Sequence, residues 1–402
     1  MLLPNLLKTS VLLVFLSTVK SSDTNHNVKD LVSSKLEEQD HPSVTMDRFH
    51  RLMNPFMAWK ELHGKAYDSI EHEIERMLVW MEHDDYIEEH NQKQDPVPSY
   101  TLGHNHFSDI PNAEFRKMHS LGQHAPDFKP LLEKRSAKMQ KLQQSSLLRG
   151  GQNGSDEESD LMNLPTHEVN WVESGAVTPV KNQERCGSCW AFSATGSIEG
   201  ANFVENGELI PLSEQILVDC DNVDHGCEGG IMDTAFEFDE ADDGLCSEVD
   251  YPYTGIDDTC KDDQCTPVPG SAVKSYVDIP EGSMHGLLMS IIESPTSIAM
   301  QADQLSFQLY SGGVFDDAGC GEAGMIDHGV LAVGFGHDED ADMNYIRVKN
   351  SWGGAWGDEG YVKLKRHSGN DWGTCAILRV MSRPTVESIG KSTAEGVDVM
   401  VQ

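Results

Sequence analysis

The nine cysteines of this chain are confined to one stretch, from Cys186 to Cys375, and the first 185 residues contain none. Such crowding is typical of a domain of a secreted protein that disulfides stabilise. Eight cysteines can pair, which leaves one free thiol, and a lone thiol in an enzyme is a candidate nucleophile. The second half of the chain is therefore predicted to be a disulfide-bearing domain.

The 402 residues carry a formal net charge of -36 at pH 7. Phosphate backbones and anionic lipid surfaces would repel such a chain, so we expect no nucleic-acid partner. The charge suits a protein that works at low pH, and it equally suits a merely soluble acidic surface. The length permits one large core or two ordinary domains and decides little.

Residues 1-21 fit a cleaved signal peptide, because Lys8 precedes an apolar stretch from Ser10 to Val19 and polar residues follow. No later segment reaches the roughly 18 apolar residues that a membrane helix needs. We therefore expect a protein of the secretory pathway, destined for a lysosome, a vacuole or the exterior, without a membrane anchor after signal removal. The alternative is a short amphipathic start to a cytosolic protein.

Four further segments precede or follow the cysteine-rich part. Residues 22-45 are polar and predict a flexible leader, and residues 46-120 carry two amphipathic helical patterns separated near Gly64 to Ser69. Residues 121-163 have the composition of an exposed linker, and proteolysis concentrates in such segments. Residues 384-402 form a polar tail. The apolar positions of the two helices are Phe49, Leu52, Phe56, Trp59 and Leu62, then Ile74, Met77, Leu78, Met81 and Ile87.

Cys189 stands in the string Cys186-Gly187-Ser188-Cys189-Trp190, at the predicted start of a helix. A thiol attacks as thiolate, and a helix N-terminus and a nearby imidazolium both lower its pKa. Cys186 and Cys189 are alternatively a redox pair or half of a zinc site. No βαβ pattern and no second close Cys/His pair supports these readings.

The base is expected to be His328, which lies 328 − 189 = 139 residues after Cys189. Asn350 follows 22 residues later, before Trp352. Its amide oxygen can fix the imidazole, and the indole can shield that bond from water. Each competing histidine lacks a nearby Asn-Ser-Trp sequence and is more simply a surface group: His167, His225, His285, His337 and His367.

These motifs make residues 164-383 resemble the whole peptidase domain of the papain family, in its cathepsin L-like branch. The likeness also runs through Gly175 to Gln183, Leu212 to Gln215, Gly226 to Gly230 and Lys349 to Gly353. It implies an α+β fold with two lobes, one helical around Cys189 and one β-barrel-like bearing His328 and Asn350. It implies a cysteine endopeptidase that needs no cofactor or metal, cuts protein and peptide substrates, and acts as a monomer.

Three roles follow from the resemblance alone. Gln183 and the backbone N-H of Cys189 are implied to form an oxyanion hole. The substrate is implied to pair with Gly229 and Gly230, while the pocket for its second residue before the cut is lined by Met232, Ala299, Gly329 and Val380. With no acidic residue, this pocket should prefer Leu, Phe, Met or Val and reject Arg.

The resemblance implies the disulfides Cys186 to Cys227, Cys220 to Cys260 and Cys320 to Cys375. Cys246 and Cys265 lack family partners, and we expect them to pair with each other.

Residues 46-120 resemble the inhibitory propeptide of the same family, which lies through the cleft against the substrate direction. Its second motif is complete in Gly103, Asn105, Phe107 and Asp109, and its helix motif is partly present, with His72, Trp80 and His83 as departures. The chain is thus expected to be an autoinhibited precursor. Two alternatives are a non-catalytic binding protein of this fold and an inhibitor that acts through its prodomain.

Overall fold

The computed structural model describes residues 46-121, 168-321, 325-366 and 372-389. The predicted signal peptide, the leader and most of the predicted linker lie outside these residues. The chain divides into two compact units, the first formed by residues up to Glu89 with His106-Pro111 and the second by His90-Asn105 with Asn112 onward. The prodomain predicted for residues 46-120 is therefore shared between the two units.

The first unit is built from two helices, α3 (Met46–Leu62) and most of α4 (Ile70–Asn91), as the apolar spacing predicts. Phe56, Trp59 and Trp80 form the centre of its buried cluster. The prediction for Leu62 was wrong, because its side chain is 78% exposed. Leu62 ends α3, so no following turn of helix covers it.

Asp109 fastens the returning segment of the first unit to its helices. Its carboxylate accepts hydrogen bonds from Lys65 Nζ at 2.8 Å and Tyr67 Oη at 2.9 Å, and its carbonyl oxygen accepts one from Arg76. His72, a departure from the family motif, accepts a hydrogen bond from Arg76 Nε at 3.1 Å. Arg76 thus keeps a polar partner on α4 although no glutamate stands at position 72.

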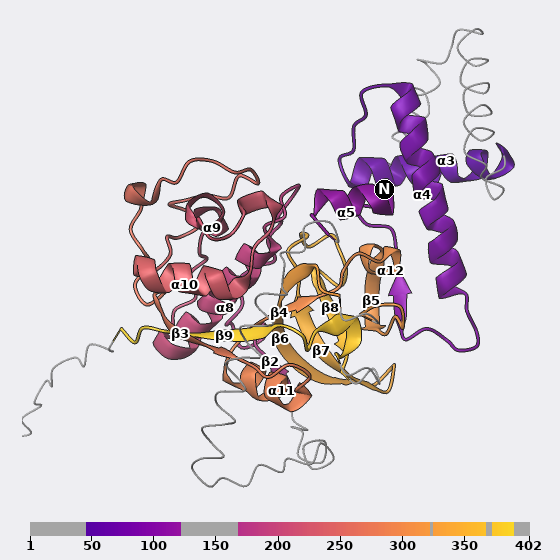
Figure 1. Ribbon diagram of the computed structural model, residues 1–402. Helices are drawn as coiled ribbons and strands as arrows, with labels where there is room; N and C mark the ends of the chain where they lie inside the picture. Colours follow the sequence, from indigo (N-terminus) through magenta and orange to yellow (C-terminus); the bar gives the residue numbers. More distant parts are fainter. Residues whose placement is uncertain (1–45, 122–167, 322–324, 367–371, 390–402) are drawn as a thin grey trace, which may run out of the picture. The chain divides into compact units, whose positions relative to one another are not determined.

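The second unit combines helices with a nine-stranded sheet (Figure 1). Its longest helix, α8 (Cys189–Asn206), packs against β6, β9 and α10. The unit also contains these shorter helices and strands: α5 (Asn112–Met118), α9 (Glu214–Cys220), α10 (Met232–Asp242), α11 (Met284–Glu293), α12 (Leu305–Gln308), β1 (Tyr100–Leu102), β2 (Val169–Asn170) and β3 (Val273–Asp278). The remaining strands are β4 (Thr296–Met300), β5 (Tyr310–Phe315), β6 (His328–Asp338), β7 (Met343–Lys349), β8 (Tyr361–Lys365) and β9 (Met381–Val386).

The strands follow the order β1-β5-β8-β7-β6-β4-β9-β3, and β2 pairs with β6. In Figure 1, α8, α9 and α10 gather on one side of this unit and strands β4 to β8 on the other. The β6 strand is buried along nearly its whole length because α8, α11 and neighbouring strands contact it. Cys189 begins the long helix and His328 begins this buried strand, so rigid elements carry both.

Eight of the nine cysteines form four disulfides, in the expected pairs: Cys186–Cys227, Cys220–Cys260, Cys246–Cys265 and Cys320–Cys375. The free cysteine is Cys189. The Cys186–Cys227 bridge links the segment before Cys189 to the segment that carries Gly229 and Gly230. A hydrogen bond from Gly187 N to Cys227 O, at 2.8 Å, links the same two segments.

Two elements within the predicted prodomain, both in the second unit, were not predicted. Strand β1 pairs antiparallel with β5, and helix α5 follows it. Asn105 Nδ2 donates to Gln308 O at 2.8 Å, and Asn112 Nδ2 donates to Gln308 Oε1 at 3.1 Å. These bonds explain why parts of the predicted prodomain belong to the second unit.

Candidate active site

Cys189 opens helix α8 and is almost entirely buried, with 8% of its surface exposed. The backbone N-H of Gly329 donates to its Sγ at 3.3 Å. Burial raises the pKa of the Cys189 thiol to about 11, although this N-H and those of the first helical turn oppose the rise. The thiol in this covered state is therefore protonated at neutral pH.

His328 and Asn350 are directly hydrogen-bonded, with 2.8 Å between Nε2 and Oδ1. The same Oδ1 accepts the backbone N-H of Ser351 at 2.8 Å, so this atom is an acceptor and His328 Nε2 is the donor. The neutral ring then carries no proton on Nδ1, which has no hydrogen-bond partner among the described residues. Burial lowers the pKa of His328 to about 4, against the opposing effect of Asn350.

Trp352 covers this pair. Its indole is fully buried and stacks on the His328 ring, with centroids 4.7 Å apart and planes 26° apart. Removing water from around a hydrogen bond strengthens it, so the indole helps to hold the imidazole against Asn350.

Gln183 is tied to the segment that follows Asn350. Its Oε1 accepts a hydrogen bond from Ser351 Oγ at 2.6 Å, and its backbone N-H donates to Ser351 O at 2.8 Å. Its Nε2 donates to Cys186 O at 2.9 Å. The amide predicted to bind an oxyanion is therefore held at both its oxygen and its nitrogen, on the loop before α8.

A hollow brings Cys189 and His328 together with several of the predicted substrate residues. We call it the Cys189 hollow, and its lining residues are His119, Ser120, Gly187, Cys189, Gly229, Gly230, Met232, Asp327, His328 and Gly329. Asp327 was not singled out from the sequence. Its Oδ1 accepts the N-H of Ala302 at 2.8 Å, and burial raises its pKa to about 7.

Gly230 could not be another residue without movement of its neighbours. A Cβ at this position would lie 2.5 Å from the Trp190 ring and 2.8 Å from Cγ of Asp224. The close packing of Trp190 and Asp224 therefore requires a glycine here, and the pairing of Gly230 with substrate backbone stays a prediction.

The four predicted pocket residues lie together. Ala299 pairs with Gly329 across β4 and β6, and its N-H donates to Val380 O at 2.9 Å. A Cβ on Gly329 would lie 3.2 Å from Met232 Sδ. Met232, Ala299 and Val380 all belong to one buried cluster, so an apolar wall adjoins the Cys189 hollow.

Two residues from the predicted prodomain, His119 and Ser120, occupy one side of the hollow. Helix α5 ends at Met118, and Ser120 takes a left-handed conformation with φ of 56°. This bend lets the chain leave α5, and the Ser120 side chain then lies over Gly187, where a Cβ would be 2.7 Å from Ser120 Oγ. Phe115 packs edge-on against Trp352 with centroids 5.1 Å apart.

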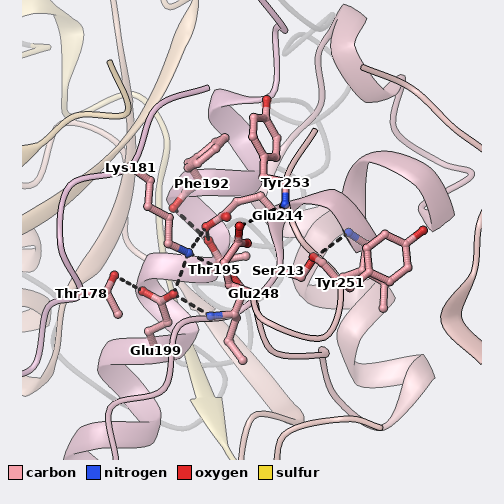
Figure 2. Close-up of polar contacts among 12 residues, drawn as sticks. Thr178, Lys181, Phe192, Thr195, Glu199, Ser213, Glu214, Glu248, Tyr251 and Tyr253 are labelled. Carbon is pink, nitrogen blue, oxygen red and sulfur yellow. Dashed lines mark hydrogen bonds and ion pairs between the residues drawn. The ribbon is translucent and has the colours of Figure 1, made fainter. Parts of the chain in front are cut away.

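Figure 2 shows a buried ion cluster that the sequence analysis did not predict. Lys181 Nζ contacts Glu214 Oε1 at 2.6 Å and Glu199 Oε1 at 3.1 Å. Thr178 Oγ1 donates to Glu199 Oε2 and accepts from Lys349 Nζ, next to Asn350. Charged residues usually lie on the surface, so each of these residues taken alone predicts an exposed side chain. The cluster could have been predicted only by knowing which distant segments the fold brings together.

Burial affects the charges of this cluster unequally. It raises the pKa of Glu214 to about 7 and lowers that of Lys349 to about 8. Burial also opposes the charge on Lys181, but Glu199 and Glu214 outweigh it and raise the lysine pKa. The cluster joins α8, which carries Cys189, to the end of β7, which precedes Asn350.

The competing histidines are elsewhere. His225 and His337 are exposed, His285 lies at the start of α11, and none lines the Cys189 hollow. His167 and His367 lie outside the described residues. Within the described ranges, no three His, Cys, Asp or Glu side chains are grouped so that they could hold a metal ion.

Comparison with known proteins agrees with the geometry. The family model described as "Papain family cysteine protease" matches residues 165–385, more than half of the chain. This chain belongs to the papain family of cysteine proteases. A second model, "Cathepsin propeptide inhibitor domain", matches residues 56–115. The protein is thus a cysteine peptidase made as a zymogen with an inhibitory propeptide.

Curated relatives and solved structures show the same relationship. Cathepsin L of Sarcophaga peregrina is 40% identical over 82% of this chain and 91% of its own length. A cathepsin L-like peptidase of Aedes aegypti is 40% identical over 76% of this chain and 85% of its own length. These papain-family members include the cathepsin L-like proteins that the sequence resemblance indicated.

Among solved structures, the recombinant stem bromelain precursor matches with a TM-score of 0.70 and 31% identity, over 84% of this chain and all of that one. Digestive procathepsin L 3 of Tenebrio molitor larval midgut matches with a TM-score of 0.66 and 31% identity, over 83% and 99%. The predicted α+β papain fold with a helical propeptide is confirmed. No helix in the described residues is long and apolar enough to cross a membrane.

Proposed function

We propose that the activated protein is a cysteine endopeptidase whose nucleophile is Cys189, whose base is His328 and whose orienting residue is Asn350. The observation that carries the proposal is the bond from His328 Nε2 to Asn350 Oδ1, which leaves Nδ1 as the basic nitrogen in a hollow shared with Cys189. A cysteine and an imidazole fixed in one tautomer are the components of thiol-based acyl transfer.

The reaction follows from these groups. His328 Nδ1 takes the thiol proton, and the thiolate attacks the peptide carbonyl carbon. Gln183 Nε2 and the N-H of Cys189 stabilise the negative charge on the carbonyl oxygen. His328 then gives its proton to the leaving amine, and a thioester remains. Water, deprotonated by His328, hydrolyses the thioester and restores the thiol.

The burial of Cys189 and His328 in the precursor is consistent with inhibition of this chemistry. Burial raises the pKa of the Cys189 thiol and lowers that of His328, so both groups are held neutral rather than as an ion pair. Gln183 Nε2 donates to Cys186 O. Opening the Cys189 hollow to water would favour the thiolate-imidazolium pair that attack requires.

For specificity, we propose that Gly229 and Gly230 pair with substrate backbone and that Met232, Ala299, Gly329 and Val380 receive an apolar side chain two positions before the cut. All four are small or apolar, and Met232, Ala299 and Val380 are at most 1% exposed. A guanidinium placed among them would lose its hydration without gaining a partner.

The segment boundaries, the oligomeric state and the cellular compartment are also proposals. We propose a signal peptide at 1-21, a leader at 22-45, the prodomain at 46-120, an activation linker at 121-163, the peptidase domain at 164-383 and a tail at 384-402. The activated enzyme acts as a monomer in a lysosome, a vacuole or the extracellular space.

The test is to incubate the purified precursor at pH 4 to 5 with a reducing agent and to follow cleavage of a Leu- or Phe-containing peptide reporter. The control is the Cys189→Ala precursor. Activity that appears as the chain shortens, and only with Cys189 present, supports the proposal. Equal silence of both proteins after removal of the prodomain by another protease would favour a non-catalytic binding protein.

A further inference from the structure

The phenol of Tyr253 links the two ends of the loop that leads into α8 (Figure 2 shows the residue). Tyr253 Oη donates to the carbonyl oxygen of Gln183 at 2.9 Å and lies 2.7 Å from Ser188 Oγ. Because the tyrosine proton is used on the carbonyl, Ser188 is the donor in the second bond. One hydroxyl therefore holds the residue that carries the oxyanion amide and the residue that precedes Cys189.

Ser188 occupies the N-cap position of α8, yet its side chain makes no capping hydrogen bond. A serine at this position usually accepts an N-H of the first helical turn. Here the hydroxyl turns to Tyr253 instead. The Ser188 backbone is thus held from outside the helix, and the N-H of Cys189 with it.

Tyr253 is itself rigidly held. Its ring packs edge-on against Phe192, one turn after Cys189, with centroids 4.9 Å apart and planes at 76°. Its backbone N-H donates to Glu248 Oε1 at 3.0 Å. Burial raises the pKa of the phenol, so it stays protonated and remains a donor at any working pH.

We propose that Tyr253 is a positioning residue for the oxyanion hole: its hydroxyl fixes the separation between the Gln183 amide and the Cys189 N-H. This rests on the proposed function, in which these two groups bind the developing negative charge. Such donors act only when they are preorganised at the position of the oxyanion, so loosening one end of the loop should weaken transition-state binding alone.

The test is Tyr253→Phe in the full-length precursor, activated at acidic pH and normalised to titrated active sites. The phenylalanine ring keeps the packing on Phe192 and loses both hydrogen bonds. We expect kcat to fall by about tenfold with KM within about twofold of wild type, the pattern of an interaction made in the transition state. Binding of a peptide aldehyde, whose thiol adduct places an oxygen in the same hole, should weaken by a similar factor.

Alkylation of Cys189 by iodoacetamide separates positioning from general damage. This displacement forms no oxyanion, so its rate should stay within about twofold of wild type. The matched control is Tyr251→Phe, two residues away, whose Oη donates to Asp219 Oδ2 at 2.8 Å. Its Oη also accepts the backbone N-H of Lys261 at 3.2 Å. Tyr251→Phe therefore also loses two phenol bonds, both remote from Gln183 and Ser188, and it should keep wild-type kcat.

Ser188→Ala removes one of the two bonds and should give part of the loss in kcat. Combined with Tyr253→Phe it should add little, since both changes release the same contact. The proposal is overturned if Tyr253→Phe keeps wild-type kcat, or if its alkylation rate falls as far as its kcat. An inactive wild-type enzyme would refute the proposed function instead.

Discussion

The imidazole of His119 lies stacked against the indole of Trp352, with ring centroids 5.1 Å apart and planes 29° apart. The same indole stacks on His328. One tryptophan therefore packs against both the end of the predicted prodomain and the proposed base. The hold of the propeptide and the shielding of the His328–Asn350 bond depend on the same side chain.

Replacing His119 by Ala should uncover the thiol. His119 is 1% exposed in the Cys189 hollow, so its removal opens a path for water and reagents. We expect iodoacetamide to alkylate Cys189 in the intact precursor at pH 7 several-fold faster than in wild type. His90→Ala is the matched control, since this buried propeptide histidine packs on Tyr100, outside the residues that line the hollow. Equal rates for wild type and His119→Ala would contradict a covering role.

Asn350→Ala should lower kcat of the activated enzyme by about ten- to a hundredfold with a small effect on KM, because the imidazole loses the acceptor that fixes its tautomer. Peptide-reporter kinetics would measure both constants. The chain offers a matched pair on its surface, where His337 Nδ1 and Asn344 Oδ1 lie 3.2 Å apart. Asn344→Ala should leave kcat unchanged. A comparable loss in both variants would argue against a specific role for Asn350.

Asp239 should make the fold less stable as pH rises. It is fully buried in α10, and burial raises its pKa well above the ordinary value, against the effect of the Val273 backbone N-H. Between the unfolded pKa near 4 and the higher folded pKa, the folded state binds more protons, so the free energy of unfolding falls with rising pH.

Asp239→Asn cannot ionise and should raise the melting temperature at pH 7.5 by a few degrees, with little gain at pH 4. Thermal unfolding would be followed in the Cys189→Ala precursor to prevent self-digestion. Asp258→Asn is the control, because Asp258 is exposed and Lys261 lowers its pKa. An equal gain at both pH values would show that ionisation of Asp239 is not the cause.

Val380→Glu should change which peptides are cut. The new carboxylate would lie in the apolar wall formed with Ala299 and Met232, where a substrate arginine could pair with it. We expect the ratio of kcat/KM for Arg over Leu, two positions before the cut, to rise at least about tenfold. Val386→Glu, at the far end of β9, should leave that ratio unchanged. An unaltered ratio for Val380→Glu would place the pocket elsewhere.

Local sequence patterns were sufficient for the long elements and for the motif residues. Apolar spacing predicted α3 and α4, and the strings around Cys189, His328 and Asn350 indicated residues that the fold brings into one neighbourhood. Their catalytic roles stay predictions. The motifs at Cys189 and Asn350 were informative because in each the candidate residue stands within two positions of a tryptophan, an uncommon residue type.

What the sequence did not predict depends on pairing between distant segments. Strand β1 has three residues and exists because it pairs with Gly312 and Gly313, about 210 positions later. Lys181, Glu199 and Lys349 are individually unremarkable charges that become a cluster only when the chain folds. The role proposed for Tyr253 likewise depends on hydrogen bonds to two partners that are 65 and 70 residues away in the sequence.

The pairing of β1 with β5 also has a consequence for the activated enzyme. Once the propeptide departs, the N-H and C=O groups of β5 that face β1 lose their partners, and the sheet gains an open edge. Exposed edges invite pairing with foreign chains. Gly313, at φ of 80°, interrupts the flat β geometry in the middle of this strand. That irregular backbone makes β5 a poorer template for pairing with another strand than a flat edge would be.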